Sequence, residues 1–302
     1  MKVLITGGSG YIGSALAGDL AKDGHEAIVL SRNPERVVNL PRGVRTVKWD
    51  GRTAGGWGEL ADGADAIVNL AGENLSAGRW TRRRKGRILD SRLNAGNAVL
   101  QAIQQAKKKP LMLIQSSAVG YYGPSGDEWL SEAAPVAEDF LAGVCQAWED
   151  STLPAEALGV RRVVVRSGVV LGNESVAYKR MLLPFRLFAG GPLGTGKQWL
   201  SWVHETDEVR ALRFLIENPE ASGVFNIAAQ PLTNRQFAKA LGGVMRRPSF
   251  FPVPAFAIRL MFGEMSTVVL DGQRVSAERL EALGFHFSFP EIEMALEDLL
   301  QR

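Results

Sequence analysis

Short runs of aliphatic and β-branched residues alternate along the chain with longer segments in which apolar residues recur every three or four positions. The short runs contain few polar residues, which is typical of strands that are buried on both faces of a parallel sheet. The longer segments have the spacing of amphipathic helices. Strands are expected over residues 2–5, 26–30, 44–49, 65–72, 111–117, 162–166, 197–204 and 224–228.

The first helical segment shows the pattern most clearly. Ile12, Leu16 and Leu20 fall on one helical face, and Gly24 is a typical helix stop. Further helices are expected through Leu100, over 140–149, from Thr233 to Leu241, up to Gly263 and over 290–300. The alternation of strands and helices predicts an α/β fold, a doubly wound Rossmann-like parallel sheet with a smaller C-terminal α+β substrate-side domain.

A glycine-rich segment, Thr6-Gly7-Gly8-Ser9-Gly10-Tyr11-Ile12-Gly13, joins the first strand to the first helix. Gly7 would let the chain turn sharply off the strand, Gly10 would let a pyrophosphate approach the backbone, and Gly13 would let the helix pack closely on the sheet. The free N–H groups and the dipole of the helix N-terminus favour phosphates. The segment therefore predicts a dinucleotide site with Tyr11 and Ile12 at the helix start, and the alternative is a turn that binds nothing.

The end of the second strand indicates which dinucleotide is preferred. An acidic residue there would bind the ribose 2′-hydroxyl of NAD, but this chain has Ser31 and Arg32, which suit a 2′-phosphate. We therefore expect NADP as the cofactor, the alternative being an ordinary exposed arginine. Leu70, Ala71 and Gly72 end the fourth strand, and the two small residues among them would let the dinucleotide lie against the backbone.

Composition excludes several other classes of protein. The 302 residues are 46% hydrophobic, enough for a large core, and the net charge of +3 is too small to argue for nucleic acid. Cys145 is the single cysteine, and His25, His204 and His286 lack metal-ligand spacing, so neither a disulfide nor a metal site is expected. The chain opens directly on a strand, and no apolar run approaches the roughly 20 residues that span a bilayer. We expect a cytoplasmic protein without membrane partners.

Three features each leave two interpretations open. The basic segment 79–87 is either a solvated helix start or a surface that attracts a phosphorylated cofactor or substrate. Asp50 follows the third strand and would be a turn carboxylate or, as the family resemblance described below implies, contact adenine. Trp199, Trp202 and His204 would line a substrate cleft or pack as a hydrophobic hinge.

Several of these segments together resemble a known family. They are the Gly-x-x-Gly-x-x-Gly turn after Thr6, the Gly72-Glu73-Asn74 loop, Asp90-Ser91-Arg92, Ser116-Ser117 followed by Tyr122-Gly123, and residues 166–172. The pattern resembles the extended, nucleotide-sugar-epimerase-like branch of the short-chain dehydrogenase/reductases. The segment from Arg246 onward resembles the C-terminal domain of unknown function of one atypical group within that branch.

The resemblance implies roles for further residues. Ser117 would hydrogen-bond a substrate carbonyl or hydroxyl as the catalytic serine, unless it caps its strand. Ser116 would lie beside the cofactor, and Arg92 would contact its phosphate or nicotinamide side, unless it forms a surface ion pair with Asp90 or a neighbouring residue. Val169 and Val170 would form an apolar backing for the nicotinamide.

One departure from the family limits the functional prediction. Conventional members carry Tyr-x-x-x-Lys on the helix over 140–149, where this chain aligns Leu141 and Cys145, or Phe140 and Val144. Cys145 has apolar neighbours, so a buried inert thiol is favoured over a nucleophile. Tyr121 or Tyr122 is a possible substitute acid. The sequence therefore predicts an NADP-dependent oxidoreductase or epimerase of unknown substrate, or else a non-catalytic NADP(H)-binding sensor or scaffold.

The same reasoning divides the chain into regions. Residues 1–172 are expected to form the NADP-binding domain, to which late elements from about 197–228 return, and residues 173–196 and 229–302 form the substrate side. Helices over 90–106 and 136–158 would form a homodimer seam or pack internally.

Overall fold

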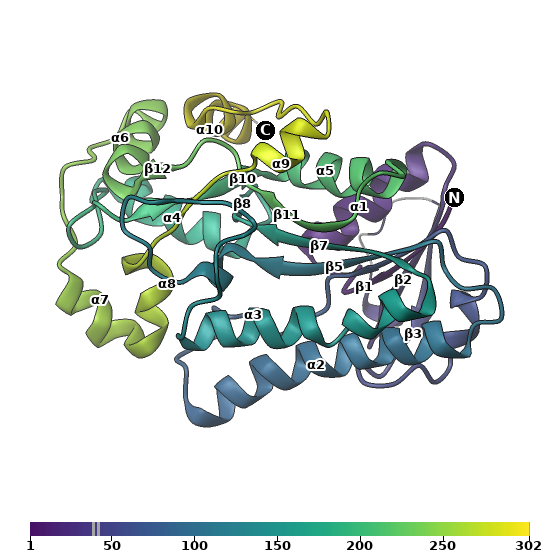
Figure 1. The fold of residues 1–302 in the computed structure, drawn as a ribbon. Helices are drawn as coiled ribbons and strands as arrows, with labels where there is room; N and C mark the ends of the chain where they lie inside the picture. The colour runs from purple at the N-terminus through teal and green to yellow at the C-terminus, as the bar shows by residue number, and fades with distance from the viewer. Residues whose placement is uncertain (38–39, 41–42, 302) are drawn as a thin grey trace.

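A seven-stranded parallel sheet forms the centre of the computed structural model, which describes residues 1–37, 40 and 43–301 (Figure 1). Its strand order is β11-β7-β5-β4-β1-β2-β3. The strands are β1 (Lys2–Thr6), β2 (Glu26–Ser31), β3 (Val44–Lys48), β4 (Ala66–Asn69), β5 (Met112–Ala118), β7 (Arg161–Ser167) and β11 (Gly223–Ile227). The predicted doubly wound Rossmann-like sheet is confirmed.

The strand order creates a crevice at one place in the sheet. The chain winds outward from β1 to β3 and then returns to the other side of β1 as β4. Ligands of open α/β sheets bind at the carboxyl ends of the strands, where the winding reverses. The turn after β1 and the residues after β4 therefore lie side by side at this reversal.

Helices cover both faces of the sheet. In Figure 1, α1 (Tyr11–Lys22) and α5 (Glu205–Glu217) lie above it, and α2 (Arg82–Gln105) and α3 (Phe140–Asp150) lie below it. Leu16 and Leu20 of α1 are fully buried against the strands, as the apolar spacing predicts. Since α2 also packs against α3 within one chain, the homodimer seam stays a prediction.

A polar ladder crosses the centre of the sheet just below the crevice. Thr6 Oγ1 donates to Asn69 Oδ1 over 2.6 Å, and Asn69 Nδ2 donates to Gln115 Oε1 over 2.8 Å. All three side chains are fully buried. Because buried polar groups cost little only when they are paired, this ladder fixes the ends of β1, β4 and β5 relative to one another.

The region after β7 forms a second core. It contains β8 (Val169–Leu171), α4 (Val176–Arg186), β9 (Trp199–Leu200), β10 (Trp202–His204), β12 (Leu232–Thr233), α6 (Asn234–Met245), α7 (Ala255–Phe262), α8 (Thr267–Leu270), β13 (Arg274–Val275), α9 (Glu278–Ala282) and α10 (Ile292–Gln301). Helices α4, α6 and α10 pack around Trp202. Leu280 and Phe285 belong instead to the core beside the main sheet, so the end of the chain contacts both regions.

The segment 197–204 differs from the expected single strand that returns to the main sheet. It forms two short strands, of which β10 pairs with β8 and β9 pairs with β12. Gly168, just before β8, allows this segment to approach closely, because a Cβ atom there would lie 2.8 Å from the Ser201 carbonyl oxygen. Within the described residues, β11 is the only strand of the region 197–228 that joins the seven-stranded sheet. No helix among the described residues combines the length and apolar character needed to cross a bilayer.

Candidate active site and cofactor crevice

Two of the three predicted turn glycines are required by the fold itself. Gly7 has a φ of +67°, and a Cβ atom there would lie 2.8 Å from the Leu70 carbonyl. A Cβ atom on Gly13 would lie 2.6 Å from the Gly7 carbonyl oxygen and from the Gly8 Cα. Gly13 therefore permits α1 to pack closely on the glycine turn. The expectation was that it would permit α1 to pack closely on the sheet.

Gly10 has a different character. Its φ of −81° and ψ of 176° suit any residue, and a Cβ atom there would meet only the Gly7 carbonyl oxygen, at 3.1 Å. Gly10 is the N-cap of α1, which has no side-chain cap and no acidic residue in its first turn. The helix N-terminus thus presents an open, electropositive backbone surface, as a pyrophosphate site requires.

The two residues after Gly10 tie the turn to its surroundings. Tyr11 Oη donates to Glu205 Oε2 over 2.5 Å and links α1 to α5. Burial and the neighbouring Glu205 carboxylate raise the pKa of Tyr11 above its ordinary value, so the phenol stays protonated. Ile12 packs against the main core.

The end of β2 carries no acidic side chain. Ser31 is buried, and its Oγ accepts a hydrogen bond from the Asn33 N–H over 3.3 Å. Arg32 is exposed, with its aliphatic stem beside Gly51. Asp50 is a turn carboxylate, because its oxygens accept from Arg52 and Thr53, and the hydrogen bond from the Thr53 N–H lowers its pKa.

Arg92 lies where the residues after β4 meet α2. A Cβ atom on Gly72 would come within 3.0 Å of the Arg92 guanidinium carbon. The residue is 9% exposed, and its guanidinium stacks 4.8 Å from the centre of the Trp148 ring and donates to the carbonyls of Ile88 and Glu73. No carboxylate pairs with it among the described residues, so the alternative of an ion pair with Asp90 is wrong.

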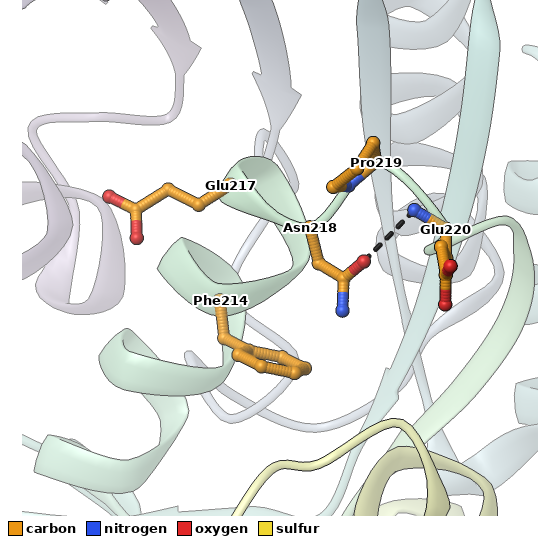
Figure 2. A pocket seen from close by; sticks show the side chains of 5 residues that line it. All are labelled: Phe214, Glu217, Asn218, Pro219 and Glu220. Atoms are coloured by element: carbon orange, nitrogen blue, oxygen red, sulfur yellow. Dashed lines mark hydrogen bonds between the residues drawn. The ribbon is translucent and has the colours of Figure 1, made fainter.

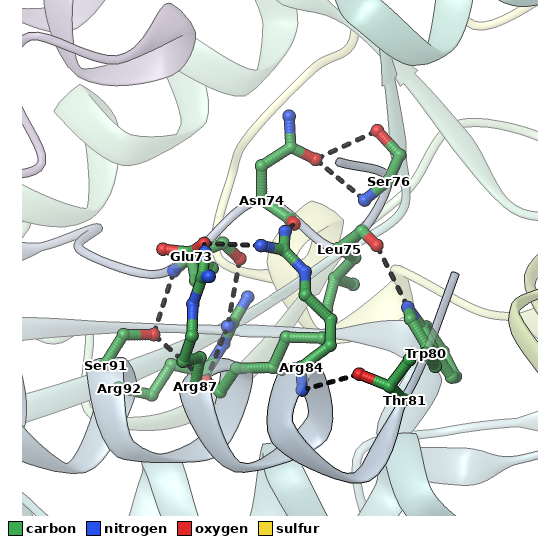
Figure 3. Close-up of polar contacts among 11 residues, drawn as sticks. Glu73, Asn74, Leu75, Ser76, Trp80, Thr81, Arg84, Arg87, Ser91 and Arg92 are labelled. Atoms are coloured by element: carbon green, nitrogen blue, oxygen red, sulfur yellow. Dashed lines mark hydrogen bonds and ion pairs between the residues drawn. The ribbon is translucent and has the colours of Figure 1, made fainter. Parts of the chain in front are cut away.

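Several side chains of the basic segment 79–87 pair with groups elsewhere in the chain. Figure 3 shows Glu73 held by Arg84, at 2.6 Å, and by Arg87. Lys85 pairs with Glu264 at 2.6 Å, and Arg79 donates to the Leu260 carbonyl over 2.9 Å. These cations therefore fix the loop after β4 and the C-terminal region, a role that neither sequence-based interpretation included.

Ser117 belongs to a buried ionic network. Its Oγ donates to Glu149 Oε1 over 2.6 Å, and Arg166 donates to both Glu149 oxygens over 2.9 Å. Arg166 also donates to the Tyr122 hydroxyl over 3.0 Å. The predicted catalytic serine is thus only 4% exposed and joins β5 to α3 and β7.

A cavity of about 220 Å³ opens beside Arg92. One wall is formed by Ala118, the last residue of β5, and by Val119 and Gly120 after it. Helix α3 and the residues near it contribute a mostly apolar wall of Trp80, Asp139, Phe140, Leu141, Val144, Cys145 and Trp148. The C-terminal region forms the facing wall with Glu264, Thr267, Val268, Asp271 and Gln273.

Neither the cysteine nor the tyrosines supply an acid to this cavity. Cys145 is buried, as expected, and burial raises the pKa of its thiol to about 11, so the inert thiol stays a prediction. Tyr122 donates to Asn226 over 2.7 Å, and burial raises its pKa as well. Tyr121 lies against Arg166, and neither tyrosine lines the cavity.

The remaining candidates have mixed outcomes. Val169 and Val170 are half-buried in β8, and Ser116 is half-buried at the end of β5.

Trp202 and His204 are fully buried, with His204 stacked on Phe289, so they pack as a core and do not line the cavity. No three metal-binding side chains gather in the part of the chain that the structure describes.

A second hollow lies at the far end of α5. Figure 2 shows Phe214, Glu217 and Asn218 around it, with Asn218 Oδ1 accepting from the Glu220 N–H over 2.9 Å. This end of α5 faces the amino ends of the strands, away from the glycine turn. It therefore takes no part in the crevice.

The fold and the crevice define a Rossmann-type dinucleotide-binding protein of the extended, epimerase-like class. Residues 3–228 match the NAD dependent epimerase/dehydratase family, and residues 253–299 match a domain of unknown function, DUF1731. The chain therefore belongs to the NAD-dependent epimerase/dehydratase family, and its atypical C-terminal domain is confirmed.

Relatives extend over the full chain. Epimerase family protein YfhF of Bacillus subtilis is 40% identical over 99% of this chain and 98% of its own length. The human epimerase family protein SDR39U1, solved with NADPH, is 36% identical, with full coverage of both chains and a TM-score of 0.89. A nucleoside-diphosphate sugar epimerase from Corynebacterium glutamicum is 31% identical over 99% of this chain and 58% of that protein, with a TM-score of 0.77.

Proposed function

We propose that this chain binds NADP(H) along the turn between β1 and α1 and acts as an oxidoreductase on a compact carbonyl compound. Gly10 carries the cofactor proposal, because its dihedral angles do not require glycine and a Cβ atom there would crowd only the Gly7 carbonyl oxygen, at 3.1 Å, whereas an approaching pyrophosphate needs the open backbone that glycine leaves. Ser31 and Arg32 at the end of β2 favour the 2′-phosphate of NADP. The human relative that was solved with NADPH supports the same cofactor.

We assign residues of the chain to successive parts of the cofactor. The α1 N-terminus would hold the pyrophosphate, Leu70 and Ala71 would lie along the adjacent backbone, and Val169 and Val170 would back the nicotinamide. Bound NADPH supplies a hydride to the carbonyl carbon of a substrate. Arg92, which lacks an acidic partner among the described residues, would attract an anionic group at the cavity.

The cavity also supports a substrate class. Its volume of about 220 Å³ lies below the roughly 300–1,000 Å³ that is usual for sites of drug-sized ligands. Its walls are mostly apolar on the α3 side. A compact, largely apolar carbonyl compound fits these dimensions better than a nucleotide sugar. Ser117, held by Glu149, would position the end of β5 and α3 and would not touch the substrate.

A non-catalytic NADP(H) sensor is the second candidate function. It is favoured by the absence of a Tyr-x-x-x-Lys pair, since the cavity presents Leu141 and Cys145 on α3. Consumption of NADPH distinguishes the two candidates, with menadione, 4-nitrobenzaldehyde and UDP-glucose as probes. The oxidoreductase proposal predicts turnover of at least one of the first two, whereas tight NADPH binding without any turnover supports the sensor.

The cofactor preference is tested with Arg32→Asp. The substitution places a carboxylate where the 2′-phosphate would lie, so NADPH affinity should fall by at least tenfold more than NADH affinity. Lys108→Asp makes the same charge change at an exposed position near the amino ends of the strands and is the matched control. Equal losses of both dinucleotides in Arg32→Asp would contradict the assignment.

A further inference from the structure

The C-terminal wall of the cavity is held firmly in place. Lys85 pairs with Glu264, and Gln198 Nε2 donates to the Val269 carbonyl over 3.0 Å. Gly272 packs so tightly that a Cβ atom there would lie 2.0 Å from the Trp199 carbonyl oxygen. The residue between these anchors, Asp271, is therefore fixed at the cavity and does not sit on a free loop.

Three carboxyl groups line the cavity, and two of them have structural partners. Asp139 caps α3, because its Oδ1 accepts from the N–H groups of Leu141 and Ala142. Glu264 is paired with Lys85 at 2.6 Å. The Asp271 carboxyl forms no hydrogen bond and no ion pair within the described residues, although its own N–H donates to the Thr267 carbonyl.

The surroundings of Asp271 favour its protonated form. Burial disfavours the charged carboxylate, the negative charge of Asp139 acts in the same direction, and Arg259 acts against both. The net result is a pKa above the ordinary aspartate value. Arg92 and the paired Glu264 are the other charged groups that line the cavity. A raised pKa lets a carboxyl group hold a proton to higher pH than a free aspartate does, as a proton donor requires.

We propose that Asp271 is the general acid–base residue of this site, supplied by the C-terminal domain in place of the missing tyrosine on α3. The inference rests on the proposed oxidoreductase function. As the carbonyl carbon accepts hydride, the electron pair of its π bond moves to the oxygen, which takes the proton of the Asp271 carboxyl. The carboxylate then regains a proton from water, and in the oxidative direction it accepts the proton of the hydroxyl group.

The kinetic test compares variants on a probe that the wild-type protein reduces. Asp271→Asn should lower kcat by at least 100-fold while leaving the dissociation constant of NADPH unchanged, because general acids contribute about 10²- to 10⁴-fold. Asp271→Glu should recover part of the rate. Glu281→Gln removes an exposed carboxylate from the same domain and should have the wild-type rate. The wild-type kcat should fall as the pH rises through the pKa of Asp271, and Asp271→Asn should lack this dependence.

A second measurement does not depend on turnover. Titration of carboxyl carbons by NMR in the NADPH-bound protein, with Asp271→Asn to identify the signal, should give a midpoint above the roughly 3.9 of a free aspartate. Arg259→Met should raise the midpoint further. An ordinary or lower midpoint, or probe reduction that Asp271→Asn leaves unchanged, would overturn the role of Asp271 alone. NADPH binding without reduction of any probe by the wild type would overturn the oxidoreductase function and, with it, the acid.

Discussion

Replacement of Glu149 by leucine should strongly destabilise the protein. The Glu149 side chain is 10% exposed and that of Arg166 is 4% exposed, so the variant leaves a guanidinium buried without its counter-charge. Ser117 Oγ loses its acceptor at the same time. The Tyr122 hydroxyl and the Glu132 carbonyl remain as neutral partners of Arg166.

The expected loss follows from the cost of separating a buried ion pair. Removal of one partner typically costs about 3–5 kcal/mol, because the remaining charge is desolvated and unpaired. A domain is stabilised by only about 5–15 kcal/mol, so Glu149→Leu should lose a large fraction of its stability. Equilibrium unfolding in urea, followed by circular dichroism, measures the free energy of unfolding.

A double-mutant cycle separates loss of the ion pair from loss of packing. Glu149→Leu/Arg166→Met replaces both charges by apolar side chains and should regain at least about 2 kcal/mol relative to Glu149→Leu alone. A single variant that loses less than about 1 kcal/mol, or a double variant that loses the sum of the single losses, would refute this reasoning.

Three further outcomes are expected. Gly13→Ala should lower the free energy of unfolding in urea by about 1–3 kcal/mol, because its Cβ atom would overlap the Gly7 carbonyl, and Gly10→Ala should lose less. Burial raises the pKa of Glu208 from 4.5 to about 7, so between these pH values the folded state holds a proton that the unfolded state has lost. Stability should therefore fall by up to about 3 kcal/mol as the pH rises from 4.5 to 7, and Glu208→Gln should abolish that slope; a flat wild-type profile would contradict it. Cys145 should not react with a disulfide reagent at pH 8 until the protein is unfolded, and rapid labelling of the native protein would contradict its high pKa.

The main sheet was predictable because its information is local. In Lys2–Thr6 the three central residues are apolar, and such a run directly before a glycine turn is typical of a buried parallel strand. Gly7 and Gly13 could be placed for the same reason, since turn and helix start are adjacent in sequence. The role of Gly13 was harder to predict from the sequence, because its neighbours depend on the folded path of the turn.

The site contacts depend on residues that are far apart in the chain. Lys85 meets Glu264 and Ser117 meets Glu149, so neither partner can be read from neighbouring positions. Asp271 carries no motif in its Leu270-Asp271-Gly272 setting, and only the fold brings it opposite α3. Trp202 and His204 have the alternation of a cleft wall, but the packing of α4, α6 and α10 buries Trp202, and His204 is buried against Phe289.

Titration with NADPH tests the central claim most directly. The wild-type protein should give a saturable heat of binding, and Gly10→Val should fold normally, as shown by its circular dichroism, yet bind NADPH at least 100-fold more weakly. The reason is that the valine side chain would occupy the backbone surface reserved for the pyrophosphate. A folded wild-type protein without saturable binding, or a Gly10→Val variant that binds as tightly as the wild type, would contradict the account.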